Sequence, residues 1–473
     1  MRINSSSLLE KIRTERNKNF TGIEPAAPRW QVLGGIDQRR LGLAVIANVL
    51  EQEGWKVKNY YEKMGDPLSD FDSLITNNSI VGISTITCTA PRAYELAQQI
   101  KREYAQVPVI MGGFHPSARP DEALEYADIV VRGEGEETIY ELLCTAKPLE
   151  EIPGISFWRD GEKVHNPNRR FLDKLSYRNI LTDSELIKAK TVPVLFSRGC
   201  PYKCTFCAVS HVMGAKMRYR PVAEVIRELK HLKQIGVKQI FIVDDNFFGD
   251  LDTAVELLRT MVKEGIKIPI GIQMRADLRI SNNPEILKLM KQAGIFILLV
   301  GLEFVEENGL KEVQKGLKLS QIKEFIITAR KWNFTLYNMF IFGCLKDNTD
   351  TPQKIIEFMK QYSPYELIQI MFMVPFPGTK LEDELKDKIF DWDWANYDAN
   401  HVVWQHPQMQ PPQQYESLLK AYKAWYHPFN VGKILAQKFL TGQWQTLALA
   451  PLFLKGIYHT MRGWEKMVQK GAD

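Results

Sequence analysis

The chain has 473 residues, a net charge of +5 at neutral pH and six cysteines. This length exceeds what one hydrophobic core usually organises, so we expect two or three domains, and the small net charge does not by itself indicate a nucleic-acid-binding protein. Three cysteines lie between residues 200 and 207, which indicates metal ligands in a reducing compartment rather than the disulfide framework of a secreted protein.

Residues 1–165 are predicted to form a Rossmann-like α/β domain. The first twenty residues alternate in charge and contain no apolar segment of the signal-peptide kind, so we expect a cytoplasmic protein. Short apolar runs then alternate with amphipathic helical stretches, as in a parallel sheet with helices on both faces. Each run carries Gly, Ser or Thr near its C-terminal end, the edge where such sheets bind ligands. The runs are WQVLGG (30–35), SIVGIST (79–85), VPVIMGG (107–113) and DIVVRGE (128–134).

A hairpin and a linker follow these runs. The segment ISFWRDGEKVHN predicts two strands that turn at Asp160 and Gly161. Residues 166–191 begin with the polar, Pro-containing stretch NPNRRF and are predicted to be a linker.

Residues 192–385 predict a partial barrel of six β/α units. Six apolar strand candidates alternate with longer helical patterns, which favours a barrel or part of one. They are VPVLFS, KQIFIVDD, IPIGIQMRA, IFILLVGLE, TLYNMFIFG and LIQIMFMVP. The cysteine cluster follows the first of these strands, and the C-terminal ends of barrel strands carry the chemistry of such folds.

The cluster itself has the spacing C-x3-C-x2-C, at Cys200, Cys204 and Cys207. Three thiolates can hold three irons of a cubane cluster and leave the fourth iron open to a non-protein ligand. Zinc is the alternative, because His211 follows at an interval that would complete a Cys3His site. Structural zinc sites usually draw their ligands from two separated knuckles, whereas all four residues here lie on one short loop.

This motif on the loop after the first barrel strand, with Phe206 just before the last cysteine, resembles the radical S-adenosylmethionine (SAM) superfamily. The resemblance covers residues 192–385 and implies a [4Fe-4S] cluster whose open iron is chelated by the amino and carboxylate groups of SAM. In that family one electron from the cluster cleaves the sulfonium, and the 5′-deoxyadenosyl radical so formed abstracts hydrogen from unreactive carbon. The electron comes from a reducing donor such as flavodoxin or ferredoxin.

The resemblance also implicates polar residues at the ends of the next barrel strands in cofactor binding. Asp244, Asp245 and Asn246 end the second strand, where the family places polar groups near the methionine amino group, and Asp245 is our candidate. Gln273 and Arg275 alternate to one face of the third strand. Glu303 follows an apolar run, where a carboxylate must be hydrogen-bonded or paired. For each of these residues a capping role or an internal salt bridge is the competing interpretation.

The N-terminal domain resembles the cobalamin-binding domain that precedes the barrel in one large subgroup of this superfamily. The resemblance is carried by LGLAVIANVLEQEGW, VGIST, VIMGGFHP and VVRGEGEE, over residues 30–145. Members that bind cobalamin place such loops around its nucleotide tail, which implicates Ser84, Thr85, Gly112, Gly113, Arg132, Gly133 and Glu134. The Asp-x-His-x-x-Gly motif that supplies a cobalt ligand in other cobalamin proteins is absent. His115 is a substitute candidate, but a structural role is the simpler interpretation.

These resemblances imply methyl transfer to an unactivated carbon, or an oxidative or ring-modifying reaction, on a hydrophobic small molecule. Without cobalamin, the first domain would be a retained scaffold and the enzyme would rely on hydrogen abstraction alone. An electron carrier or a metal-bound interaction module is the alternative of another class. The methylthiotransferase branch is disfavoured, because it carries a second cysteine trio in its N-terminal domain and only Cys88 and Cys144 lie there.

Residues 386–473 are predicted to be mainly helical. The uncharged stretch from Phe439 to Leu454 falls short of the roughly 20 apolar residues that a spanning helix needs. Residues 420–473 contain eight basic and two acidic residues, and aromatic residues lie between the basic ones in the sequence. This composition suits a helix in the headgroup region of an anionic membrane, or aromatic residues that pack under the barrel with lysines on the solvated face.

Overall fold

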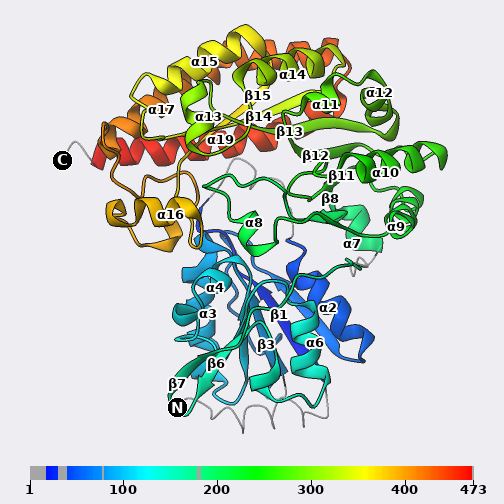
Figure 1. The fold of residues 1–473 in the computed structure, drawn as a ribbon, viewed down its shortest axis with the longest axis vertical. Coiled ribbons are helices and arrows are strands. Elements are labelled where there is room, and N and C mark those ends of the chain that lie inside the picture. Colours follow the sequence, from blue (N-terminus) through cyan, green and yellow to red (C-terminus); the bar gives the residue numbers. More distant parts are fainter. Residues whose placement is uncertain (1–17, 30–39, 77–78, 178–182, 471–473) are drawn as a thin grey trace.

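The computed structural model describes residues 18–29, 40–76, 79–177 and 183–470, so the run predicted at 30–35 lies outside the described residues. Two sheets are stacked along the long axis of the molecule (Figure 1). The first sheet belongs to the N-terminal part of the chain and the second to the barrel, and helices cover both. This arrangement confirms the α/β class, with a Rossmann-like domain before a partial barrel.

The first sheet has seven strands in the order β2-β1-β3-β4-β5-β6-β7. The pairs from β2 to β5 are parallel, and the hairpin β6–β7 adds two antiparallel strands at one edge. The strands are β1 (Asn19–Glu24), β2 (Lys56–Tyr61), β3 (Ser79–Ser84), β4 (Val109–Gly112), β5 (Ile129–Val131), β6 (Ile155–Arg159) and β7 (Glu162–His165). The helices are α2 (Gly42–Gln52), α3 (Ala90–Glu103), α4 (Phe114–Ala118), α5 (Pro120–Ala123) and α6 (Glu136–Cys144).

The central strands of this sheet are apolar on both faces, because helices cover both. Val81, Val109 and Val130 pack in one core with α3, whereas the alternate residues Ile80 and Ile110 pack in a second core with α2 and α6. The strands therefore end abruptly at polar or glycine residues where this double cover stops.

The second sheet has six strands in the order β15-β14-β13-β12-β11-β8, and every pair is parallel. Strand order follows chain order, as in a partial barrel. The strands are β8 (Val192–Val194), β11 (Ile240–Ile242), β12 (Ile270–Arg275), β13 (Ile295–Glu303), β14 (Thr335–Phe342) and β15 (Leu367–Phe372). The main connecting helices are α9 (Val222–Gln234), α10 (Leu251–Lys263), α12 (Pro284–Ala293), α14 (Leu319–Lys331) and α15 (Thr351–Tyr362).

The three clustered cysteines lie on a loop closed by its own two-stranded ribbon. Strand β9 (Ser197–Arg198) pairs antiparallel with β10 (Arg218–Tyr219), with Arg198 opposite Arg218. We call the intervening residues 199–217 the cysteine loop; they contain the short helix α8 (Val209–Val212). The ribbon fixes both ends of this loop beside the carboxyl end of β8.

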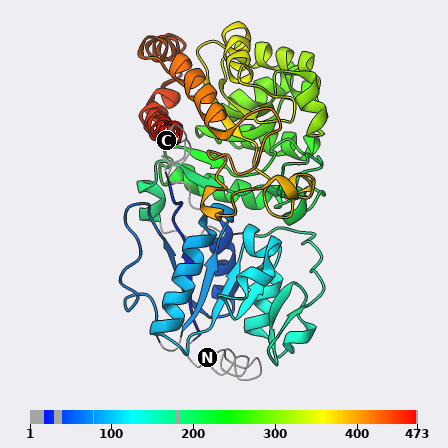
Figure 2. The ribbon, with the colours of Figure 1, turned by 90° about the vertical axis from the view of Figure 1, so that its left-hand side faces the viewer.

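Three helices form the C-terminal region, α17 (Pro411–Trp425), α18 (Pro428–Leu440) and α19 (Trp444–Lys470), which confirms its mainly helical character. They lie on the opposite side of the barrel from the green and yellow helices in Figure 2. The ring of Phe453 in α19 stacks on Tyr337 of β14. Among the described residues, α19 included, no helix is both long and apolar enough to cross a membrane.

Helix α17 also covers the free edge of β15. The Tyr422 hydroxyl lies 2.8 Å from the backbone nitrogen and 3.3 Å from the carbonyl oxygen of Ile370. The Tyr426 hydroxyl contacts the same two groups of Ile368, at 3.0 and 2.6 Å. Side-chain hydroxyls therefore replace the backbone ladder that a further strand would have supplied.

Candidate functional site

A cavity of about 410 Å³ lies between the two domains. It is bordered by the carboxyl ends of strands from both sheets: Ser84 and Gly112 end β3 and β4, and Asp245 and Gln273 come from the second sheet. Because ligands of α/β folds bind at these edges, the two domains present their binding edges to one shared space.

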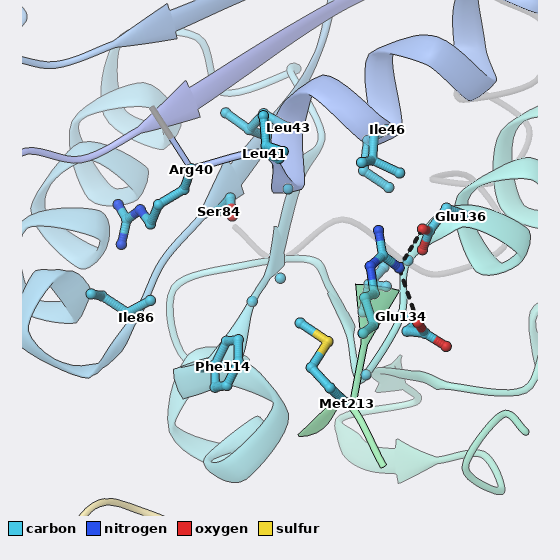
Figure 3. A pocket seen from close by; sticks show the side chains of 18 of the residues that line it. Arg40, Leu41, Leu43, Ile46, Ser84, Ile86, Phe114, Glu134, Glu136 and Met213 are labelled. Atoms are coloured by element: carbon cyan, nitrogen blue, oxygen red, sulfur yellow. Dashed lines mark hydrogen bonds and ion pairs between the residues drawn. The ribbon is translucent and has the colours of Figure 1, made fainter. Parts of the chain in front are cut away.

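The cavity walls are mainly apolar. Leu41, Leu43 and Ile46, at the start of α2 and along it, point into the cavity from one side, and Phe114 and Met213 point into it from the other (Figure 3). Met213 belongs to the cysteine loop, so this loop forms part of the wall. Such a space suits a large, largely apolar ligand held by a few polar groups.

Most of the residues predicted in the first domain line this cavity. They are Ser84, Thr85, Gly112, Gly113, Gly133 and Glu134. At Gly113, φ is +108° and a Cβ atom would lie 2.4 Å from the carbonyl oxygen of Thr85. Only glycine fits there, and the backbone of β4 therefore reaches the cavity edge without a side chain.

Arg132 points away from the cavity. Its guanidinium donates to the Asn168 side chain at 2.6 Å, to the Ile155 carbonyl at 3.1 Å and to the Asn166 carbonyl. These partners belong to β6 and the segment after β7. The position of Arg132 supports a role in fixing that hairpin rather than contact with a ligand in the cavity.

Glu134 is engaged with the second domain. One carboxylate oxygen lies 2.9 Å from Arg198, and the other pairs with Arg218 and accepts from the Leu172 backbone nitrogen at 2.9 Å. Arg198 also pairs with Glu136 at 2.6 Å. Burial alone would lower the pKa of Arg198, but the carboxylates of Glu136 and Glu134 outweigh it and raise that pKa.

The cysteine loop brings Cys200, Cys204 and Cys207 together in a half-buried position. Burial raises the pKa of the Cys200 thiol, and the charges of Asp245 and Cys204 add to this rise. Burial also raises the pKa of Cys207 to about 12, with additions from Cys204, Cys200 and Asp245. The Cys200 and Cys207 thiols therefore lie near that of Cys204.

The same region does not assemble a site for one ion. In the described parts of the chain, no three His, Cys, Asp or Glu side chains are placed to hold a single metal ion. His211 is exposed in α8. His211 therefore does not complete a Cys3His site with the three cysteines in the described structure.

Arg275 lies directly beside the cysteine loop. One guanidinium nitrogen is 3.6 Å from the Cys204 sulfur, another donates to the Lys315 carbonyl, and the guanidinium carbon lies 3.6 Å from the centre of the Tyr202 ring. Arg275 ends β12, so this strand holds a cation beside the cysteine loop.

Two acidic residues follow β11 and differ in their surroundings. Asp244 is fully buried and accepts from the Phe196 nitrogen at 2.9 Å and the Ser197 hydroxyl at 2.6 Å. Asp245 is exposed to the cavity, but the surrounding protein shields its carboxylate from water. Burial raises the pKa of Asp244 to about 7 and that of Asp245 to about 6. Asp245 is thus placed to meet a ligand, whereas Asp244 holds the start of the ribbon.

Two further predicted residues do not reach the cavity. The buried Glu303 pairs with Lys315 at 2.6 Å, which is the internal salt bridge that its apolar surroundings required. Phe206 is partly buried against the barrel core. Lys315 thus connects Glu303 to Arg275, because the Lys315 carbonyl accepts from the Arg275 guanidinium.

His115, the substitute cobalt candidate, is fully buried outside the cavity wall. Its ring lies 5.0 Å from that of Trp394 and its Nε2 is 3.7 Å from Glu122. The ring contact with Trp394 joins the first domain to the segment after β15, so His115 has a structural role.

Sequence reasoning missed Arg198, Arg218, Met213 and Lys315. Arg198 and Met213 lie close to the cysteines in the chain, and that proximity was the available signal. The partners of Arg218 and Lys315 are set only by the packing of distant segments.

Family models match both halves of this architecture. The model described as the B12 binding domain matches residues 35–143, and that of the Radical SAM superfamily matches residues 194–359. The first match contains the ends of β3, β4 and β5 that border the cavity. The second match begins at the last residue of β8 and contains the cysteine loop and the strands β11 to β14.

Curated relatives align over most of the chain. An uncharacterised methyltransferase of Pyrococcus horikoshii is 29% identical and covers 82% of this chain and 87% of its own. Bacteriochlorophyllide d C-12(1)-methyltransferase of Chlorobaculum tepidum is 26% identical, with coverage of 92% and 94%. Hopanoid C-3 methylase of Methylococcus capsulatus is 26% identical, with coverage of 85% and 81%.

A solved structure shares the whole fold. The radical SAM methyltransferase TsrM from Kitasatospora setae, with cobalamin and a [4Fe-4S] cluster bound, superposes with a TM-score of 0.70. It covers 95% of this chain and 100% of its own at 17% identity, a level that shows the fold alone.

Proposed function

Because the chain belongs to the radical SAM enzymes that carry an N-terminal cobalamin-binding domain, we propose that it methylates an unactivated carbon of a hydrophobic small molecule. Its cofactors are a [4Fe-4S] cluster, SAM and cobalamin. The residue roles, the substrate class and the electron donor, such as a flavodoxin or ferredoxin, are our proposals. We also propose that the chain divides into a cobalamin domain (1–165), a linker (166–191), a barrel (192–385) and a helical region (386–473).

One observation supports this function most strongly: a single apolar cavity is bordered by the carboxyl ends of both sheets and by the cysteine loop. A corrinoid held by the first domain would face the cluster loop without any intervening layer. Cobalamin supplies a methyl carrier, and the cluster supplies the electron that cleaves SAM.

The residues divide by the group that they would hold. Cys200, Cys204 and Cys207 would ligate three irons and leave the fourth for SAM. Asp245 and Gln273 border the cavity and would bind SAM, while Phe206, Arg275 and Glu303 support the loop from behind. The cobalamin side consists of Ser84, Thr85, Gly112, Gly113, Gly133 and Glu134, with Arg132 acting only through the hairpin that it fixes.

Methylation is favoured over oxidative ring modification by the names of the relatives that cover most of the chain. Two of them act on a bacteriochlorophyllide and on a hopanoid, by their names. Both are large polycyclic, mainly apolar molecules. A hydrophobic substrate of that kind agrees with the apolar character of the cavity wall.

The test is anaerobic reconstitution of the full chain. We expect about four irons per chain, cleavage of SAM under reducing conditions, and hydroxocobalamin that stays bound through gel filtration. Cys204→Ala should lose the cluster and the cleavage. Zinc at one ion per chain, with no broad visible absorbance, would contradict the cluster.

A cavity-filling pair tests the corrinoid separately. Ile46→Trp places a large ring in the cavity and should abolish hydroxocobalamin retention while leaving the iron content unchanged. The matched control is Ile327→Trp, because Ile327 is exposed on α14, away from the cavity. If neither the parent chain nor the control retains hydroxocobalamin, the first domain is a scaffold and the methyltransferase proposal fails.

We also propose that the α18–α19 corner contacts an anionic membrane. Phe439, Leu440 and Trp444 are 58%, 78% and 55% exposed there, and the Phe439 and Trp444 rings meet at 5.0 Å. Exposed Lys455 and Arg462 follow along α19. Apolar side chains beside basic ones suit the headgroup region of an anionic bilayer, where a hydrophobic substrate would also reside.

This contact is separable from the packing of the same helices. Trp425, Phe453 and Trp464 are buried in the barrel core cluster, so a truncated chain would expose that core. The better variant replaces Leu440 and Trp444 with Ser, both at the surface. The variant should lose flotation with anionic liposomes, which in the parent chain should weaken with salt; equal flotation of the two proteins would refute the contact.

A further inference from the structure

One carboxylate of the first domain, that of Glu134, contacts both ends of the cysteine loop. Glu134 follows β5 of the first domain and pairs with Arg198 and Arg218. These two arginines lie opposite each other in the β9–β10 ribbon, so one stands immediately before the cysteine loop and the other immediately after it. No other feature of the described chain places one side chain on both ends of this loop.

Glu134 also orders the segment that packs on the loop. It accepts from the Leu172 nitrogen at 2.9 Å, and Arg218 in turn donates to the Leu172 carbonyl at 3.2 Å. The neighbouring Phe171 ring lies under the Arg218 guanidinium at 5.0 Å and so close to Gly214 that a Cβ there would be 2.8 Å away. The contacts at the two ends of the loop therefore converge on Glu134, whereas its middle is bonded to the barrel, where the Thr205 nitrogen donates to the Val313 carbonyl at 3.1 Å.

The pairs are desolvated. The side chains of Glu134 and Arg218 are 3% and 2% exposed, and that of Arg198 is 12% exposed. Removing one partner of a buried pair leaves an uncompensated charge, which is far more costly than losing a surface pair. Glu136 still neutralises Arg198 at 2.6 Å, whereas Glu134 is the only carboxylate that the described contacts place on Arg218.

We propose that Glu134 is a positioning residue that fixes the cysteine loop against the first domain and so sets the spacing between the cluster and the cavity. The proposal deepens the proposed function and rests on it for the identity of the two cofactors. The mechanical part, a loop held at both ends from the other domain, does not depend on which cofactors bind.

The charge of Glu134 gives a second consequence. Replacing it by Gln leaves the Arg218 cation without its buried partner beside the cluster loop. The added positive charge stabilises the reduced, more negative cluster, so the reduction potential should rise. A residue that only supported the fold would not shift the potential in a fixed direction.

The experiment compares hydrogen exchange and cluster potential in the cluster-loaded full chain without cobalamin. In Glu134→Gln, amides of residues 199–217 should exchange at least tenfold faster than in the parent, and the cluster potential should rise. The matched control is Glu122→Gln, since Glu122 accepts from the Trp394 side chain at 2.7 Å across the same two domains and has no described contact with the cysteine loop. The control should change neither quantity.

A milder variant guards against misfolding of Glu134→Gln. Glu136→Gln removes one of the two carboxylates on Arg198 and none on Arg218, so faster exchange should be confined to the β9 end of the loop. Unchanged exchange in both variants, or equal acceleration in Glu122→Gln, overturns the proposal. If no cluster assembles in the parent chain, the proposed function fails, and exchange of the same loop without iron still decides the role of Glu134.

Discussion

At the scale of single residues, Arg275 offers the sharpest prediction at the candidate cluster. Its guanidinium is 3.6 Å from the Cys204 sulfur and is held there by Tyr202 and the Lys315 carbonyl. A fixed cation beside a ligand sulfur favours the reduced cluster. Arg275→Met should therefore lower the reduction potential and slow the reductive cleavage of SAM, as measured by a redox titration followed by electron paramagnetic resonance.

The control for that substitution is Tyr202→Phe, which keeps the ring under the guanidinium and should leave the potential near that of the parent. Arg275→Lys keeps the charge but loses the planar stacking, so its effect should lie between the two. A potential that is unchanged in Arg275→Met would show that the cation does not act on the cluster.

Asp347 predicts a pH dependence of stability. It is buried after β14 and accepts from the Gly343 and Cys344 nitrogens at 2.8 and 2.9 Å, and burial raises its pKa from 3.8 to about 6. Between these values the folded state binds more protons than the unfolded state. The contribution is therefore complete below about pH 4 and is lost as the pH rises through 6.

Asp347→Asn should remove this dependence, because the amide oxygen still accepts from both backbone nitrogens and carries no charge. The stability of the parent relative to the variant should fall by about 2 to 3 kcal/mol between pH 4 and pH 7. Denaturant unfolding of both proteins across this range measures the difference. A constant difference would mean that Asp347 titrates normally.

The sequence predicted residues whose role depends on local spacing and missed those that depend on distant packing. Three cysteines within one loop, and the strand ends around Ser84 and Gly112, are visible in a short window. The partners of Glu134 are 64 and 84 residues away, so no window contains them. Arg132 directly precedes the cavity-lining Gly133, but the direction of its side chain is set by the Ile155 and Asn166 carbonyls of the hairpin that follows.

At the scale of elements, the hydrogen bonds at the edge of β15 predict how much the free energy of unfolding falls when one tyrosine hydroxyl is removed. Tyr422→Phe keeps the ring and removes the group that serves both backbone atoms of Ile370. Buried backbone groups left without partners cost about 1 to 3 kcal/mol, so the free energy of unfolding should fall by that amount. Tyr458→Phe on the exposed face of α19 is the control; an equal loss in both variants would contradict the edge role.

The strands divide in the same way between those that the sequence predicts and those that it does not. The sequence predicts all six barrel strands, because each lies in an apolar run that is buried on both faces, although β8 and β11 have only three residues each. Strands β1 and β2 were missed: β1 lies in the short stretch NFTGIE without alternation, and β2 (KVKNYY) is a half-exposed edge strand with two lysines. Their place in the sheet is set by tertiary pairing rather than by pattern.

At the scale of the whole molecule, the cavity predicts a linkage between ligand and stability. Both domains line it, so a ligand there binds only when both are folded and docked. Hydroxocobalamin at 100 times its dissociation constant should stabilise the chain by about 2.7 kcal/mol. Calorimetry should show one transition that moves upward as a unit, and Ile46→Trp should show no shift; a barrel transition that ignores the ligand would place the site within the first domain.

The segment between β15 and α17, residues 373–410, has a consequence for how the two domains dock. It is bonded to the barrel, where the Phe372 nitrogen of β15 donates to the Ala399 carbonyl at 2.9 Å. It carries Glu382 and Trp394, which touch the first domain through Arg119 and Glu122. One segment therefore touches both the barrel and the first domain, so a change in its length should alter the angle at which the two binding edges face each other.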